Sequence, residues 1–372
     1  MSVMSDTVVR NCGVSEGNEE DRRELRADSP CSGNLIGNSV RQKKLILHID
    51  LNNTILVSDA VTKQGTVAAL DYFLSSVTWG HMSKGKWEWM CEAPSLSPPC
   101  NDAVSYYSKF GRVAGFTSAG PGRKFRGVLE EHLALLRWPA DLPEDKELSV
   151  RGEDGHLYHW ILPSFFQLLQ DLASQGRDFA ILFRTFGTDL PRVLSVVRRA
   201  LIQGTHPLFP DLPALKLSVS ETPGQIRCSA KGAVLIRGEE KLSSRDGDRG
   251  IYQYLSSMEG LGGFQDHFDW WARNTYSILG GKPLWVDPFD PNVQHIFVDD
   301  NIRQTDEDTI VNPKVFLDPE GSQTRTACTS ELYDLCLVQN DLLQAISDSS
   351  YFSKRIQICQ ENYERNLQQG TG

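Results

Sequence analysis

Three short apolar runs along the chain each stop abruptly at polar residues. The first run ends at Asp50, the second at Thr185, and the third at the adjacent pair Asp299 and Asp300. Runs of this length with polar ends are typical of strands buried in a parallel sheet. Because ligands collect at the carboxyl ends of such strands, the pattern predicts an α/β fold with candidate functional residues at three strand ends.

Between these runs, the spacing of apolar positions predicts further helices and strands. Helices are expected over residues 163–175, 190–202 and 264–274, and over 330–368 with an interruption by one turn. Extended segments are expected at 215–219, 282–287 and 314–317. A hairpin is expected near Lys231 and Gly232. Helical stripes that alternate with short strands are typical of a Rossmann-like parallel sheet flanked by helices.

The same pattern divides the chain into segments. The division is a polar tail over 1–42, a core from 43–65 and 161–330, an insertion over 66–160, and a C-terminal helical segment over 331–372. The tail lacks a periodic apolar face and is predicted to be disordered. The insertion exceeds the roughly 10 to 30 residues of a simple crossover between parallel strands.

Composition limits the kinds of partner that the protein is expected to bind and the cellular compartment in which it is expected. The 372 residues carry a formal net charge of −10, which argues against nucleic acid or an acidic membrane surface as the partner. No apolar run approaches the roughly 20 residues of a membrane-spanning helix. The eight cysteines are scattered without a C-x-x-C pair, as expected for reduced thiols in a cytoplasmic protein.

A glycine-rich stretch at residues 115–125 invites comparison with a phosphate-binding loop. The phosphate-loop pattern requires a lysine directly after its last glycine, and here Pro121 follows Gly120. A loop that leads into a helix over 124–138 explains the composition equally well. Both interpretations stay open at this point.

The strand ends in the order Asp50, Thr185 and Asp299–Asp300 resemble the haloacid dehalogenase (HAD) superfamily of hydrolases and phosphatases. The resemblance covers roughly 43–320 and implies a HAD-like core in which the insertion over 66–160 acts as a cap. It implies that Asp50 is the nucleophile that forms an aspartyl-phosphate. It also implies that Thr185 hydrogen-bonds a phosphate oxygen.

The resemblance further implies a Mg²⁺ cofactor. Its protein ligands would be Asp50, the backbone carbonyl of Asn52, and Asp299 or Asp300, a set of oxygen donors that suits this hard cation. A family lysine offsets charge beside the nucleophile. Lys282, in the context Gly-Gly-Lys-Pro, is the first choice for it, and Lys231 is the alternative.

Asn52 departs from the family pattern, because family phosphatases have an aspartate there as general acid and base. An asparagine amide cannot transfer a proton at neutral pH. The leading interpretation is therefore a Mg²⁺-dependent phosphohydrolase-type site with weak activity, or activity on an unidentified small phosphorylated molecule or phosphoprotein. The alternatives are a catalytically inactive HAD-like binding or scaffold protein and a haloacid dehalogenase, whose halide leaves without a proton.

Overall fold

The computed structural model describes residues 42–58, 63–118, 120–304 and 309–370. The predicted disordered tail lies outside these residues except for its last position. All described residues belong to one compact unit. The further division into core, insertion and C-terminal segment stays a prediction.

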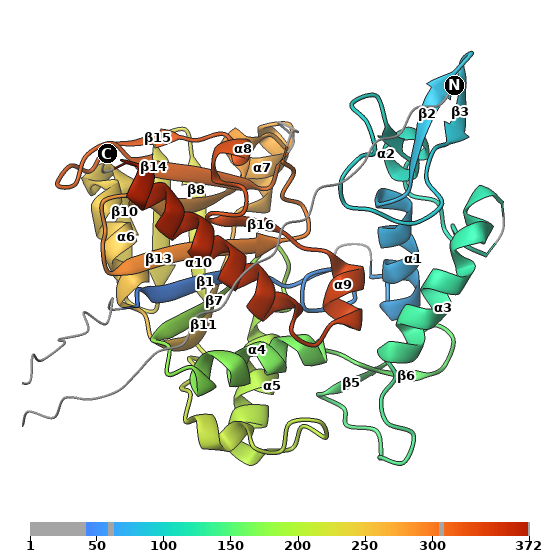
Figure 1. Cartoon of the computed structure of the whole chain (residues 1–372). Coiled ribbons are helices and arrows are strands. Elements are labelled where there is room, and N and C mark those ends of the chain that lie inside the picture. The colour runs from blue at the N-terminus through green and yellow to red at the C-terminus, as the bar shows by residue number, and fades with distance from the viewer. Residues whose placement is uncertain (1–41, 59–62, 119, 305–308, 371–372) are drawn as a thin grey trace, which may run out of the picture. The chain divides into compact units, whose positions relative to one another are not determined.

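The described residues form a mixed α/β structure around one large, mostly parallel sheet (Figure 1). Its order is β10 (Glu240–Ser243), β9 (Gly232–Arg237), β8 (Gly224–Ser229), β11 (Gly260–Gln265), β7 (Phe179–Thr185), β1 (Lys44–Asp50), β13 (Val293–Asp299) and β16 (Leu337–Gln339). The six strands from β8 to β16 run parallel, while β9 and β10 add antiparallel hairpins at one edge. The strand that carries Asp50 therefore lies inside the sheet, between β7 and β13.

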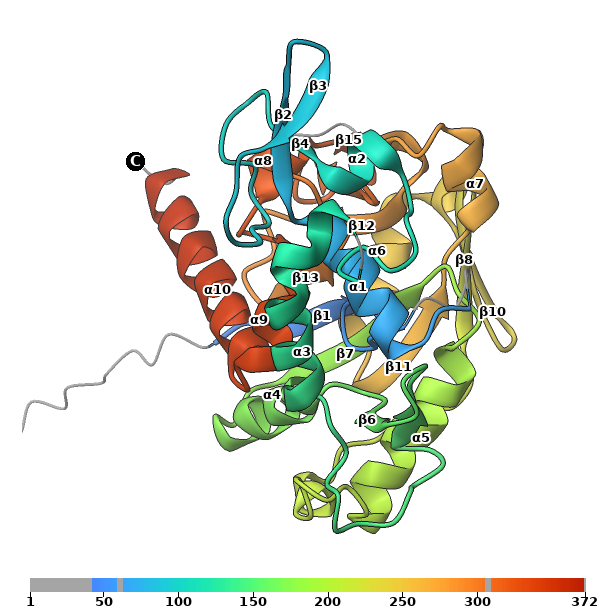
Figure 2. The same cartoon turned by 90° about the vertical axis from the view of Figure 1, so that its right-hand side faces the viewer.

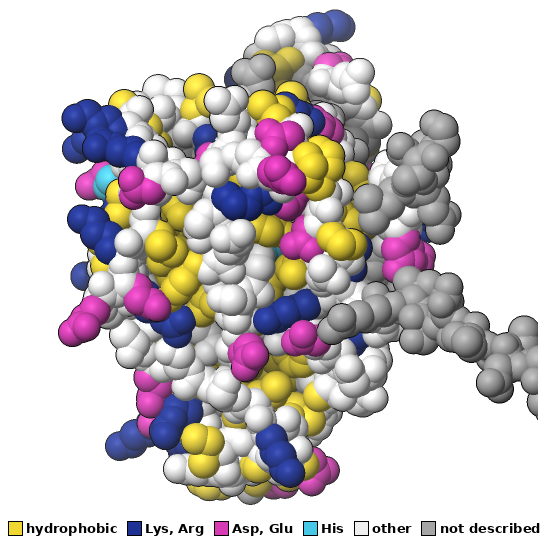
Figure 3. Space-filling view, turned by 90° about the vertical axis from the view of Figure 1, so that its left-hand side faces the viewer, with side chains coloured by type: hydrophobic (Ala, Val, Ile, Leu, Met, Phe, Trp, Pro, Cys, Tyr) yellow, Lys and Arg dark blue, Asp and Glu magenta, His cyan; other side chains and the backbone are white. Residues whose placement is uncertain are grey.

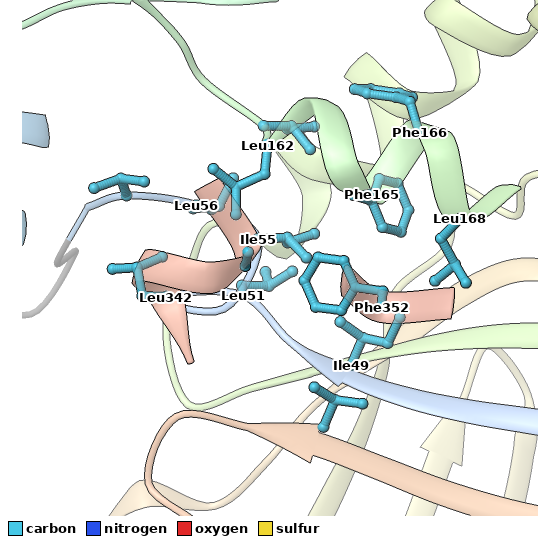
Figure 4. Packing of buried hydrophobic residues seen from close by; sticks show 14 of the residues in the cluster. Ile49, Leu51, Ile55, Leu56, Leu162, Phe165, Phe166, Leu168, Leu342 and Phe352 are labelled. Carbon is cyan, nitrogen blue, oxygen red and sulfur yellow. The ribbon is translucent and has the colours of Figure 1, made fainter. Parts of the chain in front are cut away.

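Alternation along β1 sends side chains to two different layers. Leu45, Leu47 and Ile49 join the largest apolar cluster, together with α4 (Pro163–Ser174), α5 (Leu190–Gln203), α9 (Leu342–Ser347) and α10 (Tyr351–Gly370). Figure 4 shows Ile49 near Phe165 of α4 and Phe352 of α10. Successive side chains of a strand point to opposite faces, so the even-numbered residues of β1, Asp50 among them, point to the other layer.

That other layer consists of α6 (Asp248–Ser257) and a second sheet. The second sheet has the order β12 (Lys282–Val286), β14 (Val311–Phe316) and β15 (Thr324–Thr326). Ile46 packs there with Trp285 of β12 and Phe316 of β14. The layer thus places β12, and with it Lys282, on the face to which Asp50 points.

Residues 66–160 form small elements of their own (Figure 2). They are α1 (Thr66–Ser76), β2 (Trp79–Ser83), β3 (Lys86–Trp89), β4 (Val104–Ser105), α2 (Tyr106–Phe110), a 3₁₀ turn at Pro121–Phe125, α3 (Arg126–Leu135), β5 (Ser149–Arg151) and β6 (Leu157–His159). The chain enters and leaves this segment side by side, because Leu56 and Ile161 form an antiparallel bridge. Apolar residues of α1 and α3, such as Leu70 and Leu129, belong to the same cluster as β1.

The glycine-rich loop before α3 is held by a carboxylate of α1. Asp71 accepts hydrogen bonds from the backbone nitrogens of Phe116 and Thr117, at 2.6 and 2.9 Å, and from the Thr117 hydroxyl at 2.6 Å. Donors that would cradle a phosphate are thus already paired with an internal anion. The loop is a structural connection, which favours the second of the two interpretations drawn from its sequence.

The structure confirms some of the other local predictions and corrects others. The hairpin at Lys231 and Gly232 is confirmed as the turn between β8 and β9. The helix expected at 264–274 is shorter, since β11 runs to Gln265 and α7 covers only Phe268–Arg273. The segment expected to be helical at 330–368 contains α8 (Thr329–Leu332), but also β16, whose three residues are too few to show a strand period.

The described surface is mixed in charge. Figure 3 shows one face on which Lys and Arg side chains are interspersed with Asp and Glu. Within the described residues, no helix is long and apolar enough to cross a membrane. Each of the six cysteines in this part of the chain is a free thiol.

Candidate functional site

The sheet brings the three predicted strand ends together. In its register Ile49 of β1 lies beside Val298 of β13, and Asp50 lies beside Arg184 of β7. The next residues along the two neighbours are Asp299 and Thr185. Because all three strands are parallel, their polar ends meet at one edge of the sheet.

Three carboxylates cluster at this edge. One oxygen each from Asp50, Asp299 and Asp300 lie within 4.8 Å of one another, close enough to hold one metal ion. Asp50 and Asp299 are buried, and Asp300 is half-buried. Carboxylate oxygens at such separations suit a hard divalent cation. The identity of the ion does not follow from the geometry, and Mg²⁺ is a proposal from the resemblance.

Lys282 reaches this cluster from the second sheet. Its Nζ donates hydrogen bonds to Asp50 Oδ1 at 2.6 Å, to Asp299 Oδ2 at 2.8 Å and to the backbone oxygen of Arg184 at 3.2 Å. The side chain is only 1% exposed, so its charge is matched almost entirely by these partners. Lys231, the alternative in the sequence, is exposed in the β8–β9 turn.

The cluster holds more acids than bases. With all three carboxylates ionised, the one ammonium of Lys282 would leave an excess of two negative charges. Arg303 lies nearby, but its guanidinium donates to the backbone oxygen of Asp300 at 2.5 Å and to Asn301. A divalent cation is the charge that would complete the set.

The pKa values reflect this imbalance. Burial raises the pKa of the Asp50 carboxyl to about 7, and Asp299 adds to the rise while Lys282 opposes it. Burial and the two neighbouring carboxylates also raise the pKa of Asp300 well above its usual range. Burial alone would lower the pKa of Lys282, but Asp299 and Asp50 outweigh it and hold the pKa above its ordinary value. The lysine is therefore charged, and its single charge is shared between Asp50 and Asp299.

The turn after β1 shapes the approach to Asp50. The backbone nitrogens of residues 54–56 donate to the oxygen of Leu51, and that of Asn53 donates to the oxygen of Leu56. These bonds do not use the carbonyl of Asn52, the group that the resemblance assigns to the metal. Asn53 has φ = +58°, a conformation that favours glycine and that asparagine tolerates better than most residues. The local geometry therefore accounts for an asparagine at this position.

Thr185 and Asn52 come close together around Gly187. A Cβ atom added at Gly187 would lie 3.3 Å from Thr185 Oγ1 and 3.4 Å from Asn52 Nδ2. Thr185 Oγ1 accepts a hydrogen bond from the Gly187 nitrogen at 2.9 Å, so its own proton is available to a ligand. Glycine at this position leaves space between Thr185 Oγ1 and the Asn52 amide.

A buried polar chain below the site was not predicted from the sequence. Arg184 pairs with Asp266, at 2.7 and 2.9 Å, and donates to His48 Nδ1 at 3.0 Å. His48 Nε2 lies 3.0 Å from His295 Nδ1, and His295 Nε2 lies 2.9 Å from the Ser256 hydroxyl. Arginine can only donate hydrogen bonds, so Nδ1 of His48 accepts and the ring carries its proton on Nε2. His48 Nε2 then donates to Nδ1 of His295, which therefore carries its own proton on Nε2.

Burial lowers the pKa of both histidines, that of His295 to about 3, and the Arg184 charge lowers that of His48 further. Both rings are therefore neutral. The signal in the sequence is Arg184 itself, since a charge inside an apolar strand requires a buried partner. Its partner Asp266 lies 82 residues away and has no local signature.

Comparisons with protein-family models, with curated proteins and with solved structures found no match for this chain. The resemblance to the HAD superfamily therefore stays a prediction that rests on the strand-end residues.

Proposed function

We propose that this chain is a HAD-like phosphohydrolase that uses Mg²⁺ and the Asp50 carboxylate as nucleophile. The observation that carries the proposal is the contact of Lys282 with both Asp50 and Asp299 inside a three-carboxylate cluster. A strand end that served only as a turn would not require a buried ammonium and two further acids. The proposal includes residues 66–160 as a cap-like insertion, supported by the paired entry and exit at Leu56 and Ile161.

In the proposed mechanism, Asp50 attacks phosphorus while the Thr185 hydroxyl and the Asn52 amide bind phosphate oxygens. Lys282 holds Asp50 in place and favours its ionised form through its short contact with Oδ1. Asp50, the Asn52 carbonyl, Asp299 and Asp300 would hold Mg²⁺, which polarises the phosphoryl group and offsets its charge when bound. Water then attacks the aspartyl-phosphate and regenerates the Asp50 carboxylate.

Hydrolysis of acetyl phosphate, with and without Mg²⁺, tests this function. Acetyl phosphate has a good leaving group, so its turnover does not depend on a general acid at position 52, where this chain has asparagine. The expected result is Mg²⁺-dependent turnover that Asp50→Asn abolishes. Turnover that persists in Asp50→Asn, or its complete absence in a folded wild-type protein, would contradict the proposal.

A second candidate is a catalytically inactive HAD-like binding or scaffold protein, and Asn52 is the observation that favours it. Such a protein would keep the metal and phosphate contacts but lack turnover. Binding of inorganic phosphate that requires Mg²⁺, without hydrolysis of acetyl phosphate, would identify it. A haloacid dehalogenase ranks below both, because a cluster of three carboxylates suits a metal site better than a halide site.

A further inference from the structure

A hollow of about 270 Å³ lies beside the candidate site, at the carboxyl ends of β7 and β11. Its walls combine the aromatic side chains of Phe186 and Phe268 with polar and charged residues, among them Arg227, Gln265, Asp266 and Asp269. The volume is near the lower end of the roughly 300 to 1,000 Å³ that ligand sites occupy. Phe186 and Gln265 directly follow or end these strands, whereas a second hollow of similar size lies elsewhere, between α4 and α10.

The hollow is joined to the proposed nucleophile by two short contacts. Phe186 directly follows Thr185, and its ring centroid lies 5.1 Å from Lys282 Nζ. The same Nζ lies 2.6 Å from Asp50 Oδ1. Phe186 therefore borders both the hollow and the charge cluster.

The wall formed by Phe186 is aromatic and supported from behind. Trp271 stacks on Phe186, with ring centroids 5.3 Å apart and planes at 18°, and Phe268 meets Phe186 edge-on at 5.7 Å. Aromatic pairs in these arrangements are favourable beyond their buried area. Phe186 and Phe268 therefore give the hollow an aromatic side.

The opposite side of the hollow is polar. Arg227 is half-buried and donates to the backbone oxygen of Asp266 at 3.2 Å and to Gln265 Oε1 at 3.1 Å. Gln265 in turn donates to the backbone oxygen of Gly187 at 3.0 Å. These bonds fix the guanidinium beside the aromatic wall, where its remaining N–H groups can meet polar atoms on a ring.

Asn52 limits which leaving group can depart. Without a general acid, the oxygen that leaves phosphorus carries its negative charge away. A phenol, with a pKa of about 10 as in tyrosine, accepts that charge far better than an aliphatic alcohol. The lack of a general acid at position 52 and the aromatic wall of the hollow therefore both favour an aryl leaving group, and the two arguments are independent.

We infer that the substrate is an aryl phosphate monoester, such as phosphotyrosine, whose ring lies in the hollow against Phe186. This inference rests on the proposed phosphohydrolase function. An Asp50 oxygen bonds to phosphorus, and the bond from phosphorus to the aryl oxygen breaks, so a phenolate leaves and takes a proton from water. A second water attacks phosphorus, breaks its bond to Asp50, and yields inorganic phosphate.

The test compares kcat/KM on four substrates with Mg²⁺: acetyl phosphate, phenyl phosphate, a phosphotyrosine peptide, and the same peptide with phosphoserine. The aryl substrates should exceed the phosphoserine peptide by at least about 10²-fold, the lower limit of what a missing general acid costs an alkyl ester. The small ester and the peptide distinguish a free aryl phosphate from a phosphotyrosine protein as the source of the ring.

Phe186→Ala tests the ring site directly. It should lower the ratio of phenyl phosphate to acetyl phosphate kcat/KM by roughly threefold to tenfold, the loss expected for one aromatic contact. Phe289→Ala, which removes a ring that is 46% exposed in the loop before β13, is the matched control and should leave the ratio unchanged. Phe186→Leu replaces Phe186→Ala if the alanine variant does not fold.

The outcomes separate the two claims. The aryl site is overturned by equal rates on the phosphotyrosine and phosphoserine peptides, or by an unchanged ratio of phenyl phosphate to acetyl phosphate kcat/KM in the folded Phe186 variant. In either case, Mg²⁺-dependent turnover of acetyl phosphate would still support the hydrolase function. No turnover of acetyl phosphate overturns both.

Discussion

Lys282 Nζ lies 2.6 Å from Asp50 Oδ1, although 232 residues separate the two in the chain. The contact crosses from the second sheet to the central one. It joins a charged residue that begins β12 to a charged residue that ends β1, and both are buried. The predictions below follow from this contact and the carboxylates around it.

Lys282→Met should lower the free energy of unfolding by about 3 to 5 kcal/mol, because it leaves buried carboxylates without their ammonium. Urea unfolding measures the change. The matched control is Lys354→Met, which breaks a 2.6 Å pair with Asp348 on the surface, where the lysine side chain is 63% exposed. An exposed pair contributes about 0 to 1 kcal/mol, so equal losses in the two variants would contradict the structural role of Lys282.

Saturating Mg²⁺ should raise the melting temperature, because a ligand that binds only the folded state stabilises it. Asp50→Ala and Asp299→Ala should each abolish the rise, since each removes an oxygen donor from the cluster. Differential scanning calorimetry measures the shift. Asp246→Ala, at an exposed acid in the turn before α6, is the control and should keep the full shift. A shift that survives in both cluster variants would place the metal elsewhere.

Mg²⁺ binding should weaken as the pH falls from about 8 to about 6, because metal ligands must be deprotonated. Burial raises the pKa of Asp50 to about 7, so this carboxyl takes up its proton within that range. In the absence of metal, the raised pKa means that the folded state holds this proton more tightly than the unfolded state. Asp50 therefore makes the metal-free protein less stable as the pH rises from its ordinary pKa of 3.8 toward 7.

Isothermal titration calorimetry in two buffers of different ionisation enthalpy measures both the affinity and the proton release of Mg²⁺ binding. Proton release should be largest below the raised pKa and vanish well above it. Affinity that is constant over this range would mean that Asp50 is ionised throughout, as an ordinary exposed carboxyl would be.

Asn52→Asp should raise the hydrolysis of alkyl phosphates by at most about 10²- to 10⁴-fold, the range of general acid catalysis. That corresponds to roughly 2.7 to 5.4 kcal/mol of activation free energy. The gain should be larger for a phosphoserine peptide than for phenyl phosphate, because the phenolate requires less help to leave. Steady-state kinetics on both substrates measure the difference.

The control for this gain is the double variant Asp50→Asn, Asn52→Asp, in which no aspartyl-phosphate can form at position 50. Loss of the gain there supports the nucleophile assignment. A gain that persists without Asp50 contradicts the mechanism, and a folded, Mg²⁺-binding Asn52→Asp protein without any gain favours the inactive binding protein.

The sequence by itself determined the strands that carry the site. The apolar runs that end at Asp50, Thr185 and Asp299 are β1, β7 and β13, because burial on both faces of a parallel strand demands continuous apolar residues. It also placed an asparagine, which cannot transfer a proton, at position 52, where the resemblance implies an acid. Short elements such as β16 carried too few residues to show a period.

Only the tertiary structure decided how the charges are paired. Lys282 and Lys231 are both flanked by glycine and followed by apolar residues, yet one is buried between two carboxylates and the other is exposed in a hairpin turn. In the same way, the position of Arg184 inside an apolar strand indicated that it needs a buried partner. The sequence did not indicate that this partner is Asp266. Ion pairs between distant residues are set by how sheets and layers pack, and the energy that selects them arises only when packing removes water from both partners.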